Sequence, residues 1–346
     1  MENRNKKILV IMTGGTICSS VGEDGKRFSD VESVKIVKSF IEGESPYRDK
    51  IDFETIMPLD VLSENLTVPG WNTLINVFKT KVQWDNYSGI IVLHGTDTLA
   101  YTSSLLAVLL SGASIPIIMV SAQLPLSEPG TNGHINFRAA AELIVNGIAP
   151  NVYAVYQNSD GVIYLHFGAH LLQCANYSDD FFSGDKMIIE NPENADLPGK
   201  AFETESMYIN KIDELKPSVL SLVPYVGIDY SRYSLEGVKA VVHGTFHSES
   251  VCVERKNGKE GYGKFSVLSL LDRCKEMDIP LFLAPCSPTA FKYESTGDAL
   301  KSGALNIEGT TFEMAYVKTM LGCALGYRKK ELAEFVNESI NYEAIK

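Results

Sequence analysis

Two short segments of this chain end in hydroxyl residues that could carry out nucleophilic chemistry. Residues 13–16 read Thr-Gly-Gly-Thr, and residues 94–98 read His-Gly-Thr-Asp-Thr. A Thr hydroxyl is a weak nucleophile until a base removes its proton, so it needs a partner within hydrogen-bond reach. Thr16 is therefore a candidate nucleophile, and Thr96 is a second hydroxyl with the acid Asp97 directly beside it.

The same threonines could instead cap helices, because Ser, Thr and Asp are preferred at helix N-termini. Capping is the better interpretation for Thr98, whereas for Thr16 and Thr96 the residues alone leave capping and catalysis open. Gly14 and Gly15 are expected to let the backbone come close to a small ligand, since glycine has no side chain to obstruct it.

The position of the two segments favours a shared pocket. Each follows a short apolar run, residues 7–12 and 89–93, with no alternation of polar residues. Such runs are typical of parallel strands covered by helices on both faces. Open α/β sheets bind ligands just beyond the carboxyl ends of their strands, where the crossover connections leave in opposite directions. Two Thr-containing turns at that edge would face one crevice.

Other kinds of site fit the sequence less well. A dinucleotide-binding turn needs Gly-x-Gly-x-x-Gly, which residues 13–16 do not match. His166 and His170, and likewise His243 and His247, have an i, i+4 spacing that a metal could use, but no third ligand with suitable spacing accompanies them. We therefore expect no metal and no cofactor, and for His94 a structural role within a buried strand end.

Composition limits the class of protein. The chain has 346 residues, of which 45% are hydrophobic, and a net charge of -12 that argues against a nucleic-acid partner. The segment 4–7 carries positive charge but runs directly into the first apolar run, which argues against a signal peptide. No apolar run is long enough to span a membrane. The six cysteines are scattered without a Cys-x-x-Cys pair, as expected of free thiols in a cytoplasmic protein.

The length and the order of segments predict an α/β fold with two domains. The larger N-terminal domain, residues 1–190, is expected to have a mainly parallel sheet with helices on both faces. A polar segment with two prolines marks a linker over 191–214, and a smaller parallel α/β domain follows over 215–346. The strands are expected at 90–93, 115–120, 152–156, 219–223, 239–242 and 280–284. The helices are expected around 71–78, 98–111, 135–146, 265–274, 312–325 and 329–340. The polar segment 18–28 could form a lid over the pocket.

Taken in order, several motifs resemble those of the bacterial-type L-asparaginases, specifically the cytoplasmic type I branch. They lie at residues 13–17, 94–98, 121–126, 132–136, 295–297 and 302–303. The likeness thus extends over essentially the whole chain. It implies two α/β domains, a homodimer or homotetramer, a small amino-acid substrate, and hydrolysis of the side-chain amide of L-asparagine without metal or cofactor.

The resemblance also implies roles for individual residues. Thr16 matches the nucleophile, Thr96 matches a second Thr that activates water, and Asp97 would hold the α-amino group of the substrate. Ser63, with Glu64 beside it, would meet the α-carboxylate. Backbone N–H groups around the two threonines, together with Ala122, would form the oxyanion site. The implied substrate-binding residues are Gly15, Ser63, Glu64, Gly95 and Ala122.

Two departures from the family leave the activity open. The family pairs its first Thr with a lid Tyr, where this chain has Phe28, and it places a Lys against its second Thr. Here no Lys or Arg occurs between Arg138 and Lys186. His166 or His170 could take over as base near neutral pH. The alternatives are an amidase for another small amide, an impaired relative that only binds aspartate or asparagine, and a tRNA-dependent amidotransferase component, which carries an additional N-terminal domain.

Overall fold

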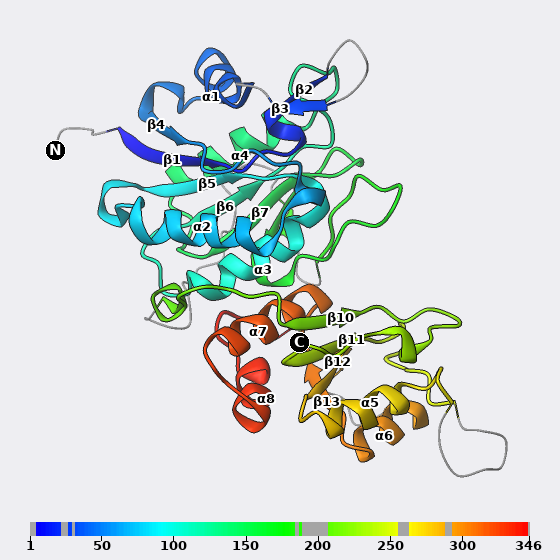
Figure 1. Ribbon diagram of the computed structural model, residues 1–346. Helices are drawn as coiled ribbons and strands as arrows, with labels where there is room; N and C mark the ends of the chain where they lie inside the picture. The colour runs from blue at the N-terminus through cyan, green and yellow to red at the C-terminus, as the bar shows by residue number, and fades with distance from the viewer. Residues whose placement is uncertain are drawn as a thin grey trace. The chain divides into compact units, whose positions relative to one another are not determined.

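The computed structural model divides the chain into two compact units (Figure 1). It describes residues 5–21, 27–29, 32–183, 187–188, 207–254, 263–287 and 293–344. At 19–21, 27–29, 32–34 and 187 it describes the backbone alone. The first unit comprises Met1–Lys211 and Ile340–Tyr342, and the second comprises Ile212–Ser339 and Glu343–Lys346. Of the expected linker, residues 191–206 lie outside the described residues.

The units differ from the expected domain bounds at the end of the chain, where Ile340–Tyr342 belong to the first unit. Ile340 is fully buried there. The side-chain amide of Asn341 donates hydrogen bonds to the backbone oxygen of Ala107 and to Oδ1 of Asn151, each at 2.9 Å. These bonds satisfy a buried polar side chain, which explains why this short segment is held in the first unit.

The first unit is built on a seven-stranded, mainly parallel sheet in the order β4-β1-β5-β6-β7-β8-β9. The parallel strands are β1 (Lys6–Met12), β4 (Ile51–Ile56), β5 (Gly89–Leu93), β6 (Ile117–Val120) and β7 (Val152–Gln157). The antiparallel strands are β8 (Ile163–Phe167) and β9 (Met187–Ile188). The predicted α/β class with a mainly parallel sheet is confirmed.

Helices cover both faces of this sheet (Figure 1). On one face lie α1 (Glu32–Glu42) and α4 (Gly133–Val145), and on the other lie α2 (Val68–Thr80) and α3 (Leu99–Leu109). Ile8 and Val10 of β1 join the core cluster formed with α1 and α4. Because side chains alternate along a strand, the equally buried Leu9 and Ile11 face the opposite layer. Burial on both faces accounts for the unbroken apolar runs in the sequence.

The strand order places a topological switch point between β1 and β5. The chain leaves β1 for β4 on one side, returns to β5 on the other side of β1, and continues outward to β6. Three short 3₁₀ helices follow the carboxyl ends of these strands: Thr16–Cys18 after β1, Ser63–Asn65 after β4, and Thr96–Thr98 after β5. A hairpin of β2 (Ser19–Val21) and β3 (Arg27–Ser29) leaves from the first of them.

The second unit has a four-stranded parallel sheet in the order β10-β11-β12-β13. Its strands are Val219–Leu222, Ala240–Gly244, Leu281–Cys286 and Leu305–Glu308. Its helices are α5 (Val267–Glu276), α6 (Glu294–Lys301), α7 (Phe312–Ala324) and α8 (Lys329–Asn337). Short 3₁₀ turns complete the two units at Arg48–Lys50, Trp84–Asn86, Gly168–His170, Tyr208–Lys211 and Tyr230–Arg232.

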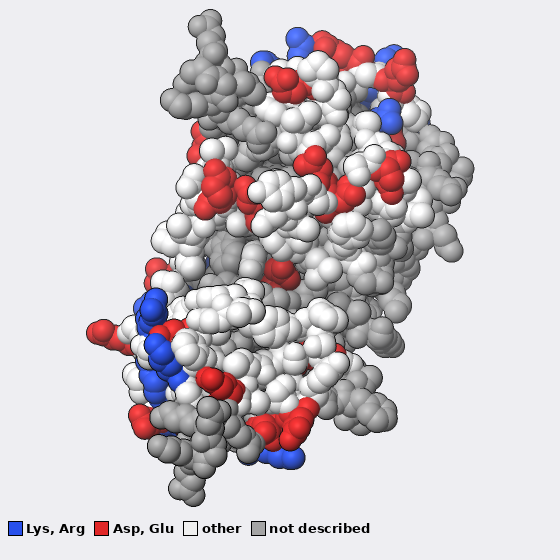
Figure 2. Space-filling model, turned by 90° about the vertical axis from the view of Figure 1, so that its right-hand side faces the viewer, with Lys and Arg blue, Asp and Glu red and all other residues white. Residues whose placement is uncertain are grey.

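The surface reflects the acidic composition. On the face drawn in Figure 2, red acidic side chains are widely spread, whereas Lys and Arg gather in small groups. Among the described residues, no helix combines the length and the apolar composition needed to cross a membrane.

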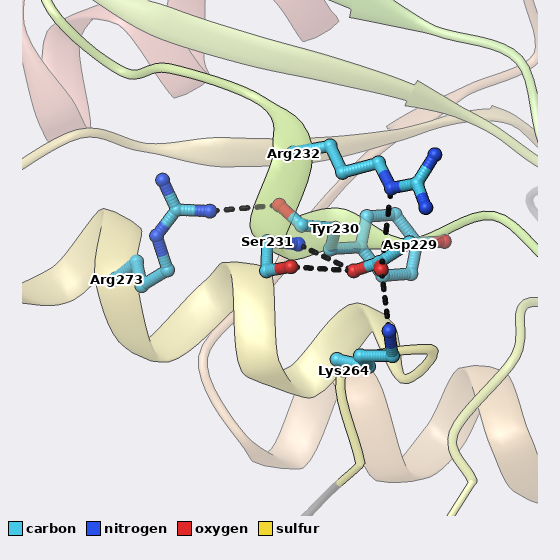
Figure 3. Close-up of polar contacts among 6 residues, drawn as sticks. All are labelled: Asp229, Tyr230, Ser231, Arg232, Lys264 and Arg273. Carbon is cyan, nitrogen blue, oxygen red and sulfur yellow. Dashed lines mark hydrogen bonds and ion pairs between the residues drawn. The ribbon is translucent and has the colours of Figure 1, made fainter.

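Asp229 binds the 229–233 turn to Lys264, which precedes α5, and Arg273 binds the turn to α5 itself (Figure 3). Oδ2 of Asp229 lies 2.8 Å from Nζ of Lys264, and Oδ1 accepts hydrogen bonds from Oγ and N of Ser231 at 2.6 and 3.1 Å. Arg273 of α5 donates to the backbone oxygens of Tyr230 and Tyr233 at 2.8 and 2.7 Å. The bond from Lys264, with help from Ser231, lowers the pKa of Asp229 from 3.8 to about 2.

We predict that Asp229→Asn lowers the unfolding temperature at neutral pH. Because the folded state lowers the pKa of Asp229, its stabilising effect is complete above about pH 4 and is lost as the pH falls toward about 2. The difference between variant and wild type should therefore shrink over that range in thermal denaturation curves. Asp272→Asn, at an exposed position on α5, is the matched control. An equal effect of both variants would contradict the prediction.

Candidate active site

The 13–16 turn is held against the chain that follows β4. Gly14 and Gly15 adopt φ values of +100° and +80°, which glycine reaches readily and other residues do not. The amide of Gly15 donates to the oxygen of Val61 at 2.9 Å, and the amide of Val61 donates to the oxygen of Thr13 at 3.2 Å. A Cβ on Gly14 would lie 2.3 Å from that oxygen of Val61, so only glycine fits.

The backbones of Gly15 and Gly95 are in direct contact. A Cβ on Gly15 would lie 2.4 Å from Cα of Gly95, and a Cβ on Gly95 would lie 3.2 Å from Cα of Gly15. Thr16 directly follows Gly15, and Thr96 directly follows Gly95. Thr16 is 8% exposed, and Thr96 is half-buried. The structure therefore brings together the 13–16 turn and the 94–98 turn.

Ser63 joins this contact from the carboxyl end of β4. The amide of Asp97 donates to Oγ of Ser63 at 3.1 Å, and Oγ of Ser63 lies 3.4 Å from Oδ2 of Asp97. The hydroxyl of Thr98 donates to the backbone oxygen of Ser63 at 3.1 Å. The carboxylate of Asp97 remains exposed, as does that of Glu64 next to Ser63. An exposed carboxylate beside two hydroxyls can bind an ammonium group or accept a hydrogen bond.

His94 and Ala122 lie next to the carboxyl ends of β5 and β6. The amide of His94 donates to the oxygen of Val120, the last residue of β6, and Ala122 follows two residues later and is fully buried. Nδ1 of His94 lies 2.8 Å from the backbone oxygen of Gly95. Burial lowers the pKa of His94 to about 4, so the imidazole is neutral at physiological pH. These contacts support the structural role expected for His94.

The histidines considered as replacement bases have other partners. Nδ1 of His166 lies 2.9 Å from Oγ of Ser183, and Nε2 of His170 donates to the backbone oxygen of Tyr342.

The described residues contain no cluster of three or more His, Cys, Asp or Glu that could hold a metal ion. Nδ1 and Nε2 of His243 contact Gly244 O and the hydroxyl of Tyr230.

One polar residue that reaches the 94–98 turn was not found from the sequence. The side-chain amide of Gln173 donates to the backbone oxygen of Asp97. Gln173 comes from the stretch without Lys or Arg between Arg138 and Lys186. It lies in a segment without periodicity, so the sequence did not distinguish it from other loop residues.

The expected lid is described only in part. Cys18 is fully buried, and burial raises the pKa of its thiol to about 12, which makes it a poor nucleophile. Phe28 lies in β3 opposite Ser20 of β2. The side chain of Phe28 and residues 22–26 lie outside the described part of the chain.

Comparison with known proteins identifies the family. A family model described as "Asparaginase, N-terminal" matches residues 7–187, more than half of the chain. The chain belongs to the asparaginase family. This match includes the turns that carry Thr16, Ser63 and Thr96, and it confirms the resemblance inferred from the motifs. The asparaginase fold also extends over the remainder of the chain, as the solved structures show.

Relatives of this asparaginase-family protein have more than one named activity. An L-asparaginase from Thermococcus kodakarensis is 29% identical over 245 residues, 67% of this chain and 72% of the relative. A glutamyl-tRNA(Gln) amidotransferase component from Thermoplasma volcanium is 25% identical over 356 residues, 98% of this chain and 81% of the relative. The family and these relatives support an amidohydrolase.

Solved asparaginase structures share the fold. The thermostable L-asparaginase from Thermococcus kodakarensis superposes with a TM-score of 0.73 at 21% identity, over 98% of this chain and 99% of that one. L-asparaginase I from Vibrio cholerae gives a TM-score of 0.73 at 19% identity, over 99% and 100%.

Gly95→Ala tests whether the close packing of the 94–98 turn against Ser63 matters. Gly95 has φ -76°, which alanine adopts easily, but the new Cβ would lie 2.4 Å from Oγ and 2.6 Å from Cβ of Ser63. A displacement of about 1 Å in a catalytic group can lower the rate by about a hundredfold, so we expect a loss of kcat/KM on that scale for amide hydrolysis.

Gly297→Ala is the control, since a Cβ there would meet nothing within 4 Å and α6 should gain up to about 1 kcal/mol in helix propensity. Unchanged amide hydrolysis by Gly95→Ala would show that the packing of Gly95 against Ser63 has no catalytic importance.

Proposed function

We propose that this protein hydrolyses the side-chain amide of L-asparagine to L-aspartate and ammonia, with Thr16 as nucleophile. The observation that carries the proposal is the backbone contact between Gly15 and Gly95. It supports a single reaction centre because each glycine is followed by the threonine that the family resemblance assigns to catalysis. The proposal includes a cytoplasmic location and a homodimer or homotetramer.

In the first half of the reaction, Oγ of Thr16 attacks the amide carbon, and the nitrogen leaves as ammonia after gaining a proton. The products are an acyl-enzyme ester on Thr16 and free ammonia. Backbone N–H groups around Thr16 and Thr96, together with Ala122, stabilise the negative charge that develops on the carbonyl oxygen. Such preorganised donors usually contribute the largest share of rate enhancement in acyl transfer.

In the second half, water attacks the ester carbon near the hydroxyl of Thr96, which restores Thr16 and releases aspartate. Asp97 binds the α-amino group of the substrate, and Ser63, with Glu64 in its neighbourhood, meets the α-carboxylate. Oγ of Ser63 accepts from the amide of Asp97 and donates to its carboxylate, and these bonds support the arrangement because they restrain the carboxylate beside Thr96.

Among the described residues, few groups near the two threonines could carry out proton transfer. A Gln amide such as that of Gln173 donates hydrogen bonds but does not take up a proton near neutral pH. The lack of a well-placed base typically lowers a rate by about two to four orders of magnitude. We therefore propose a slow amidohydrolase in which bound water near Thr96 carries the protons, while Asp97 binds the α-amino group.

The relatives named as glutamyl-tRNA(Gln) amidotransferase components motivate a second candidate. One of them aligns with 98% of this chain. In that case the protein would release ammonia from glutamine only when a partner protein and charged tRNA are present. The acidic net charge of -12 favours the first candidate, because a protein that contacts a phosphate backbone needs basic surface.

Ammonia release by the purified protein tests the proposal with L-asparagine, L-glutamine and D-asparagine as substrates. Thr16→Ala removes the attacking oxygen and should lower kcat by about a thousandfold or more. Thr16→Ser keeps a hydroxyl and should retain part of the activity. Thr80→Ala is the control, since that hydroxyl bonds to Asn76 on the exposed side of α2.

Three outcomes would contradict the proposal. Thermal stabilisation by aspartate without turnover would indicate a binding protein. Activity on glutamine that appears only with a partner protein and tRNA would indicate the amidotransferase. Full activity in Thr16→Ala would exclude this residue as nucleophile.

A further inference from the structure

A closed loop over residues 172–182 presents Gln173 to the 94–98 turn. Its two ends are joined by a hydrogen bond from the amide of Leu172 to the oxygen of Phe182 at 3.0 Å. Inside the loop, Sγ of Cys174 donates to the backbone oxygens of Ser178 and Asp180 at 3.0 and 3.2 Å. The residue next to Gln173 is therefore held by two contacts across the loop.

The 172–182 loop is also fixed to the sheet. Phe181 is fully buried and packs edge-to-face on Tyr156 of β7, with ring centroids 4.8 Å apart. Asn158 donates to the oxygen of Phe181 and accepts from its amide, both at 3.0 Å. The carboxylate of Asp180 accepts from the amide and hydroxyl of Ser159. A side chain on such a frame has little freedom to move away from its partner.

The partner of Gln173 is the backbone carbonyl of Asp97, within the 94–98 turn. The amide of Leu99 bonds to the oxygen of Thr96, while the oxygen of Asp97 accepts from the side-chain amide of Gln173. From the other side, Ser63 accepts from the amide of Asp97. The peptide units on either side of the Asp97 side chain are thus held from two different elements.

We propose that Gln173 is a positioning residue that fixes the 94–98 turn and thereby the hydroxyl of Thr96 for hydrolysis of the acyl-enzyme. This inference rests on the proposed function, since it assigns Thr96 to the second half of that reaction. A neutral amide suits this place because its N–H groups satisfy a carbonyl without forming an ion pair with the carboxylate of Asp97. That carboxylate stays available to the substrate's ammonium group.

Kinetics of Gln173→Ala provide the main test, with Gln157→Ala as the matched control. Gln157 is equally half-buried, and its amide also donates to a backbone oxygen, that of Gly161 at 2.8 Å. Loss of one ordinary hydrogen bond at the 94–98 turn should lower the hydrolysis step of the acyl-enzyme by about tenfold. Because only the second step slows, kcat and KM should fall together while kcat/KM stays nearly constant.

A burst of ammonia, equal in amount to the enzyme, should precede the slow phase, because the acyl-enzyme accumulates. Gln173→Glu places a carboxylate opposite a carbonyl oxygen and should lower kcat further at neutral pH. Relative to wild type at each pH, its activity should recover as the pH falls, since the protonated carboxyl can donate again. Gln173→Lys keeps a donor of similar reach and should retain a higher kcat than Gln173→Ala, but its charge can pair with Asp97 and should raise KM.

A loss of kcat/KM with unchanged KM and no burst would overturn the assignment to the second step. Wild-type kinetics in Gln173→Ala would overturn the positioning role itself, while the proposed function would stand if Thr16→Ala is inactive. If wild type releases no ammonia, the proposed function fails, and hydrogen exchange decides the positioning role alone. Faster exchange of amides 96–99 in Gln173→Ala than in Gln157→Ala would support it, and equal exchange would overturn it.

Discussion

The close approach of two glycines at the edge of the first sheet is the constraint on which the candidate site depends. Met12 of β1 pairs with Leu93 of β5, and Thr13 continues the pairing through its amide and its hydroxyl, both bonded to the oxygen of Leu93 at 3.0 and 2.9 Å. The segments that follow β1 and β5 therefore leave the sheet in register. A side chain at position 15 would force them apart, and one at position 95 would clash with Ser63, so glycine at both positions lets the register persist into the turns.

The candidate site at the carboxyl ends of β1 and β5 contains more backbone dipoles and hydroxyl groups than charged side chains. Helix α3 begins at Leu99, directly after the 94–98 turn, and its positive N-terminal end therefore lies at the carboxyl edge of the sheet. His94 is neutral because it is buried, and the thiol of Cys18 stays protonated for the same reason. Negative charge that develops on a carbonyl oxygen at this edge would meet N–H groups and the end of a helix. This kind of stabilisation is available before the reaction begins and needs no reorganisation.

Much of this could be predicted from the sequence, because local patterns determine it. The apolar runs at 89–93 and 152–156 became β5 and β7, and the apolar stretch over 98–111 became α3 (Leu99–Leu109). Strand β4 was not anticipated, since it is an edge strand with charged residues at Asp52 and Glu54 and only partial burial. An edge strand lacks the continuous apolar character that marks the strands between two helix layers.

Contacts made by single long-range hydrogen bonds could not be predicted in the same way. Gln173 lies 76 residues from Asp97 in sequence, in a loop without periodicity, and its role depends on how Phe181 and Asn158 fix that loop. His166 or His170 was a candidate replacement base because an imidazole titrates near neutral pH, and ordinary packing was the alternative. The structure instead gives these residues partners in Ser183 and Tyr342. Residue type indicated the possible chemistry, but only the fold determined which side chain reached the turn.

The glycine contact also suggests where members of this family can differ in reaction. It fixes the relation between the two threonine turns through backbone atoms alone, so it does not depend on the side chain of the substrate. Differences in substrate and rate must then arise from elements that approach the turns from outside, such as the Ser63–Asn65 helix and the 172–182 loop. Because these elements hold the 94–98 turn through a few hydrogen bonds, a single substitution there can change the reaction while leaving the fold intact.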